Sequence, residues 1–266
     1  MKIAIEHRTA WHVAAHGGIL TQLLRMTPRS NPRQQVLAWD LDLPGHASRG
    51  TDAFGNVQHL LSVDPGREDL ALTARGVVEI RPQAEDLPEP LSPLLFLRST
   101  PLTHADLELL GFADNFRIPN PSRDVLRALM VAVGSAVALA PATAFAGHDA
   151  ARVFADRRGS VHDLVHVFVS CARLLGVPAR FVSGYAHTGG SSASHLAGHA
   201  WAEAFVHGHW HTFDIANRLD RPTTHLTLAI GMDYLDACPV RGIHFGSARE
   251  HLSAQALIEQ AQQANQ

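Results

Sequence analysis

Short stretches in which apolar and polar residues alternate dominate the first 100 positions of the chain. Alternation with a period of two is typical of strands that bury one face. Turn-forming residues separate these stretches, among them Pro44-Gly45 and the segment 52–56. We therefore expect a β-rich region built as a small sandwich or a barrel-like sheet. The predicted strands are residues 1–8, 35–43, 57–63 and 76–80.

The pattern becomes helical after a proline-rich segment at residues 82–101. Its clearest helix covers residues 161–175, where Gly176 provides a C-terminal cap and Pro178 prevents continuation. Strands are predicted after this helix, and His207-Gly208 is typical of a two-residue hairpin turn. A helix followed by antiparallel strands predicts an α+β fold class. Helices are expected at 125–139, 149–156 and 161–175, and strands at 179–185, 199–206 and 210–214.

These changes of pattern predict three regions. Residues 1–100 form the β-rich N-terminal region, residues 101–247 form the core, and residues 248–266 form a C-terminal tail that frays. No stretch approaches the roughly 20 apolar residues that cross a bilayer. The first residues alternate like a strand rather than a signal peptide, so we expect a cytoplasmic protein without a membrane partner.

Charge and cysteine content narrow the function further. The formal net charge of the 266 residues is −3, which argues against a nucleic-acid partner. Neither of the two cysteines, Cys171 and Cys238, belongs to a C-x-x-C pair, so a disulfide framework or a cysteine-based zinc site is not expected. The chain has 18 histidines, scattered along its length, so histidine chemistry is the feature to follow.

The predicted hairpin brings one histidine and one aspartate together. If His207-Gly208 is a two-residue turn, Trp201 lies opposite Asp214, and His199 is its diagonal neighbour on the same face. An aspartate beside a histidine fixes the tautomer of the ring and stabilises its protonated form, as general-base catalysis requires. A purely structural pair on a sheet is the alternative that this pattern leaves open.

Several spaced motifs carry a family resemblance. They lie at residues 24–29, 52–56, 159–163, 172–185, 198–203, 213–214, 231–234 and 239–242, together with Gln35 and His166. Together they resemble the bacterial transglutaminase-like proteins, with the β-rich region that precedes the core in that family. The resemblance covers most of the chain and implies a papain-like core of the cysteine protease superfamily.

In that family a cysteine at a helix N-terminus attacks an amide carbonyl, a strand histidine shuttles the proton and an aspartate orients the histidine. The helix start favours the thiolate. The resemblance places His199 and Asp214 in the last two roles and Val161 at the nucleophile position. Because valine carries no nucleophile, the resemblance implies a pseudoenzyme. We expect a non-catalytic or impaired homologue that binds a peptide or protein partner in the former active-site cleft.

Two alternatives would retain hydrolysis of an amide or peptide. His162 and His166 stand four residues apart on the predicted helix, a spacing that can hold zinc if His199 or Asp214 adds a third ligand. Apart from this zinc site, no cofactor is expected.

The second alternative is a nucleophile other than residue 161. Ser160, one residue earlier, offers a hydroxyl if its loop is rearranged. Cys171 offers no substitute, because ten residues of helix place it about 15 Å away along the axis.

Overall fold

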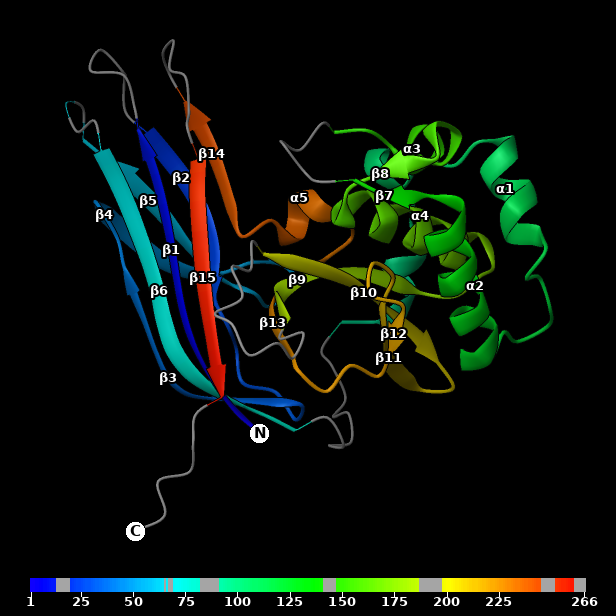
Figure 1. Ribbon diagram of the computed structural model, residues 1–266, viewed down its shortest axis with the longest axis horizontal. Coiled ribbons are helices and arrows are strands. Elements are labelled where there is room, and N and C mark those ends of the chain that lie inside the picture. The colour runs from blue at the N-terminus through cyan, green and yellow to red at the C-terminus, as the bar shows by residue number, and fades with distance from the viewer. Residues whose placement is uncertain are drawn as a thin grey trace.

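The computed structural model has a β-sandwich on one side and an α+β unit on the other, with a five-stranded sheet between the sandwich and the helices (Figure 1). The α+β fold class and the β-rich N-terminal region are confirmed. The structure describes residues 1–12, 20–64, 66, 69–81, 91–140, 147–186 and 198–244, and the backbone of residues 252–260.

The sandwich consists of two four-stranded antiparallel sheets. The first has the order β15-β1-β6-β3, and the second has the order β14-β2-β5-β4. Alternating apolar residues of β1, β2, β5 and β6 fill the space between them, with Leu24, Leu61 and Leu72 fully buried. The strands are β1 (Lys2–His12), β2 (Leu20–Thr27), β3 (Gln34–Asp42), β4 (His46–Thr51), β5 (Val57–Val63), β6 (Asp69–Ile80), β14 (Val240–His244) and β15 (Leu252–Gln260).

The last two strands of the chain differ from the expected division into three regions. β14, from the expected core, pairs with β2, and β15, from the expected tail, pairs with β1 over its whole length. Both pairings join segments more than 200 residues apart in sequence. A local sequence pattern does not indicate which distant strand a segment pairs with, and for this reason residues 248–266 were expected to fray.

A five-stranded antiparallel sheet of order β12-β11-β10-β9-β13 forms the centre of the α+β unit. Figure 1 shows the green helices between residues 107 and 174 on the side of this unit away from the sandwich. The elements are η1 (Pro93–Leu97), η2 (Pro101–Thr103), α1 (Leu107–Asp114), α2 (Arg123–Ala136), β7 (Ala138–Leu139), α3 (Ala150–Asp156), β8 (Arg158–Gly159), α4 (Val161–Leu174), β9 (Ala179–Ala186), β10 (His199–Val206), β11 (His209–Asp214), β12 (Leu219–Asp220), β13 (His225–Gly231) and α5 (Tyr234–Ala237).

Helix α4 is the central helix and is buried along most of its length. Ser160 is its N-cap, and the side chain and backbone of Ser160 and Asp163 bond reciprocally in a capping box. Gly176 follows its C-terminus with φ 78°, the left-handed conformation that glycine adopts without strain. A helix that is apolar nearly all round is stable only inside a core, and α4 packs among α1, α2, α3 and the sheet.

Two amides from the sandwich fasten β13, the edge strand of the central sheet. The side chain of Gln34 donates to the carbonyl of Thr227 at 2.9 Å and accepts from its N–H at 2.8 Å. Asn56 bonds Ile230 in the same two ways, at 2.7 and 2.9 Å. These bonds replace a neighbouring strand, so the sandwich fixes the position of β13. Among the described residues, no helix is long and apolar enough to cross a membrane.

A histidine–aspartate–histidine cluster as the candidate functional site

His199 and Asp214 meet at one end of the central sheet. His207 and Gly208 both have positive φ, as a tight hairpin turn requires, and Val206 pairs with His209. This register carries His199 at the start of β10 to Asp214 at the end of β11, and Nε2 of the histidine lies 2.7 Å from Oδ2 of the aspartate. The contact predicted from the hairpin pattern is therefore confirmed.

Asp214 is fully buried and surrounded by hydrogen-bond donors. Its Oδ2 accepts from His199, from His225 at 2.8 Å and from the side-chain amide of Asn217 at 2.8 Å, and its Oδ1 accepts from the backbone N–H of Asn217 at 3.1 Å. Burial alone would raise the pKa of this carboxyl group, but the hydrogen bonds from the two histidines and Asn217 hold the pKa well below its usual range. Asp214 is therefore a buried, ionised carboxylate.

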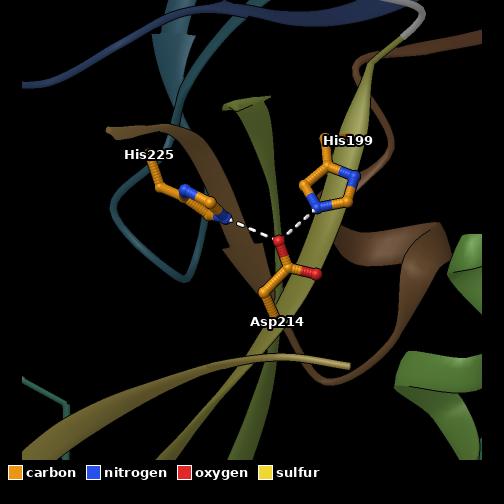
Figure 2. Close-up of side chains that lie close together, drawn as sticks. All are labelled: His199, Asp214 and His225. Carbon is orange, nitrogen blue, oxygen red and sulfur yellow. Dashed lines mark hydrogen bonds and ion pairs between the residues drawn. The ribbon is translucent and has the colours of Figure 1, made fainter. Parts of the chain in front are cut away.

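His225 is a member of the site that the sequence interpretation missed. It begins β13 and points at the same carboxylate oxygen as His199, from the opposite side (Figure 2). Burial lowers the pKa of His225, and its bond to Asp214 opposes that shift. No local signal identifies His225, because β9 and β10 separate β13 from β11 in the sheet. Asn217 was also missed, although an Asp followed three residues later by Asn is a known turn pattern.

Gly184 and Trp201 shape the floor of the cluster. Gly184, on β9, pairs with His199 on one side and with Thr227 on the other. A Cβ at Gly184 would lie 2.6 Å from the indole of Trp201 and 2.0 Å from a backbone oxygen of β13. The glycine thus lets the indole lie over β9, where its ring centroid is 4.8 Å from that of His225.

Val161 is the first residue of α4, the position where the resemblance places a nucleophile. It is half-buried and packs against the core of the α+β unit. The preceding residue, Ser160, donates its hydroxyl hydrogen to Asp163 Oδ2 at 2.8 Å and accepts from the Asp163 N–H at 3.3 Å. The hydroxyl of Ser160 is therefore engaged in capping α4.

His162 and His166 both lie on α4 and have different surroundings. His166 is fully buried, and its Nε2 accepts the backbone N–H of Tyr234 at 3.1 Å. The ring of His162 packs against that of Tyr234 with centroids 4.5 Å apart. Burial lowers the pKa of His162 to about 4, with Asp163 raising it and nearby His199 lowering it further. The start of α4 thus lies close to His199.

Both cysteines are buried and free. Burial raises the pKa of the Cys171 thiol to about 12 and also raises that of Cys238. Neither thiol therefore supplies the thiolate that cysteine chemistry requires.

The cluster contains the donor atoms of a two-histidine, one-carboxylate metal site. Within the described residues, His199, Asp214 and His225 form the group whose ligand atoms all lie within 4.8 Å of one another. Nitrogen and carboxylate donors of this kind suit zinc or iron(II). The pair His162 and His166 does not belong to that group.

Two family models match this chain. The family model of the transglutaminase-like superfamily matches residues 112–215, which span α4, His199 and Asp214. A second model, the bacterial transglutaminase-like N-terminal region, matches residues 3–79 of the sandwich. The chain belongs to the transglutaminase-like superfamily.

Relatives within the superfamily cover nearly the whole chain. An uncharacterized protein of Mycobacterium leprae, ML0607, is 25% identical over 92% of this chain and 94% of its own length. Another from Mycobacterium tuberculosis, Rv2569c, is 24% identical over 82% and 79%. A crystal structure of a candidate cysteine protease from Cytophaga hutchinsonii superimposes with a TM-score of 0.80, at 20% identity and with 98% and 92% coverage. That similarity confirms the fold, sandwich included.

Proposed function

We propose that this protein is a transglutaminase-like homologue without cysteine catalysis, which binds a peptide or a segment of a partner protein where its relatives perform acyl chemistry. The observation that carries the proposal is the identity of residue 161. The His199–Asp214 pair is assembled at 2.7 Å, while the helix start beside it presents a valine. An ordered histidine–aspartate pair without an attacking atom supports recognition of an amide group rather than its cleavage.

The surroundings of the other candidate nucleophiles support the same proposal. Ser160 is bonded to Asp163, and Cys171 is fully buried in the core. For Ser160 to act as the nucleophile, α4 would have to lose its N-terminal cap. For Cys171 to do so, α4 would have to turn its core face outward. The proposal includes a cytoplasmic location and a partner that is neither nucleic acid nor membrane, and cell fractionation followed by pull-down tests these two parts.

Peptide turnover and peptide binding test the proposal together. The probe is a blocked glutamine peptide, offered with and without a primary amine as acyl acceptor. The wild-type protein should bind the peptide without hydrolysing or transamidating it. The variant Val161→Cys should gain turnover that iodoacetamide abolishes, whereas the matched variant Val161→Ala should not. Wild-type turnover that His199→Ala abolishes would contradict the proposal.

A metal-dependent amide hydrolase is the second candidate. The observation that favours it is the convergence of His199, Asp214 and His225 within 4.8 Å. Metal analysis of tag-free protein after exposure to zinc tests it: one bound zinc that His225→Ala removes, accompanied by peptide hydrolysis, would establish this function. The variant His162→Ala tests the zinc pair on α4 in the same way. His209→Ala, on the exposed turn of the β10–β11 hairpin, controls for adventitious binding.

A further inference from the structure

One carboxylate oxygen holds two imidazole rings in this site. Figure 2 shows His199 and His225 on either side of Asp214, each with its Nε2 toward Oδ2. The two distances, 2.7 and 2.8 Å, are those of short charge-assisted hydrogen bonds. The three residues come from β10, β11 and β13, so the arrangement depends on the tertiary fold.

The positions of the hydrogens follow from the acceptors. An ionised carboxylate has no hydrogen to give, so each Nε2 must carry one. The side-chain amide nitrogen of Asn217 lies 2.8 Å from the same oxygen and is also a donor. Asn217 is therefore a third donor to Oδ2, beside the two rings. Both histidines, when neutral, are fixed as the tautomer protonated at Nε2.

The two Nδ1 atoms then differ in what can reach them. That of His225 is buried and lacks a hydrogen-bond partner among the described residues, so its ring contributes only through Nε2. The side chain of His199 is 10% exposed, and within the described segments its ring hydrogen-bonds through Nε2 to Asp214. The amide nitrogen of Asn217 lies 3.3 Å from the same Nε2, but in this tautomer both atoms are donors and form no hydrogen bond. Its Nδ1 presents a lone pair, and Val161, the first residue of α4, offers no side-chain donor.

We propose that His225 is a positioning residue that holds Asp214, and through it His199, so that Nδ1 of His199 accepts a hydrogen bond from an N–H of a bound peptide. The peptide half of this inference rests on the proposed function. The positioning half concerns the protein alone. In the arrangement that the family resemblance implies, a thiol at position 161 would be a donor to Nδ1, whereas valine has none to offer.

Metal binding at the same three residues requires the opposite protonation. A ligating Nε2 must present a lone pair, and the ring must then donate from Nδ1. Nδ1 of His225 is buried, and within the described part of the chain no acceptor for that hydrogen lies beside it. The site of the Nε2 hydrogen therefore separates this proposal from the metal-dependent alternative.

Nitrogen-15 NMR of histidine-labelled protein tests the positioning half. We expect Nε2–H signals for both His199 and His225 in the free protein, each protected from exchange with water. In His225→Phe, exchange of the His199 Nε2–H should accelerate by about tenfold, because Asp214 loses one of its supports. In His225→Gln, whose side-chain amide can still donate to Asp214, the rate should return to within about twofold of the wild type.

His59→Phe, which replaces a half-buried histidine of β5 in the sandwich, is the control and should leave the His199 signal unchanged. An unprotonated Nε2 on either ring, a stoichiometric metal at the site, or equal exchange rates in His225→Phe and the wild type would each overturn the positioning role. If His225→Phe does not fold, the tautomers of the wild type and the exchange rate in His225→Gln still test the positioning role.

Binding of singly N-methylated versions of one blocked glutamine peptide tests the recognition half. Methylation at one backbone nitrogen should weaken binding by about tenfold, and that loss should vanish in His199→Ala, because both changes remove the same hydrogen bond. Equal binding of all methylated peptides would overturn this half. If no peptide binds at all, the proposed function fails with it, while the NMR result still decides the role of His225.

Discussion

Acid should weaken the attachment of the sandwich to the central sheet through His7. This histidine lies on β1, is buried, and bonds the hydroxyl of Tyr185 on β9 at 2.6 Å through Nδ1 and that of Thr9 at 3.0 Å through Nε2. Tyr185 packs with apolar residues of β1, β6 and β13, so His7 lies where the two units meet. Burial lowers the pKa of His7 from 6.5 to about 4.

The sign and size of the effect follow from proton linkage. The unfolded chain takes up the proton first, because its pKa of 6.5 lies above the folded value of about 4. The contribution of His7 to stability is therefore complete above pH 6.5, is lost as the pH falls from 6.5 to 4, and is constant below that. Between pH 7.5 and 5 the expected loss is about 2 kcal/mol, and the limit at low pH is about 3 kcal/mol.

Urea unfolding of the wild type and of His7→Gln at pH 7.5 and 5, followed by circular dichroism, measures this loss. Glutamine can hydrogen-bond but does not titrate, so the stability of the variant should fall by about 2 kcal/mol less than that of the wild type. The other buried histidines remain in both proteins and cancel. His209→Gln, an exposed change on the hairpin turn, should preserve the wild-type pH dependence. If His7→Gln loses as much stability as the wild type, the argument from burial is wrong.

Three further predictions concern position 161 and the core. In Val161→Cys, the helix start and the imidazole of His199 should lower the pKa of the new thiol by about two units. Iodoacetamide at pH 5.5 should therefore alkylate this thiol about tenfold faster than in the urea-unfolded variant. Equal rates would show that this position does not activate a thiol. Glu203→Gln leaves Arg180 buried without its charge partner and should lower the free energy of unfolding by about 3–5 kcal/mol in urea titrations. Gly184→Ala places a Cβ 2.0 Å from the backbone of β13 and should lower the free energy of unfolding by about 3 kcal/mol or more. Gly111→Ala, in open space on α1, should raise it by about 0.5–1 kcal/mol. Similar melting temperatures for these two glycine variants would contradict the packing argument.

The sequence was informative wherever local rules decide the structure. Gly176 and Pro178 predicted the C-terminus of α4 to within one residue, and the turn at His207-Gly208 fixed the register that joins His199 to Asp214. A hairpin requires only a period of two and a turn type, so its cross-strand contacts can be predicted from one sequence.

The parts that were missed depend on the order of strands in space. His225 reaches Asp214 because β13 pairs with β9 and does not lie beside β12, the strand that precedes it in the sequence. β14 and β15 leave the α+β unit and complete the sandwich, although their sequence lies where a core segment and a frayed tail were expected. The hydrophobic period and the composition of a five- or nine-residue strand do not identify a pairing strand more than 200 positions away.

The return of β14 and β15 to the sandwich makes the α+β unit an insertion held at both ends. One crossing joins β6 to η1, and the other joins α5 to β14. During synthesis, β1 gains its second neighbour only after the whole α+β unit has left the ribosome, so the sandwich is the last part to be completed. A protease cut between β6 and η1 would separate the chain into two pieces that still share both sheets of the sandwich, and we expect those pieces to remain together.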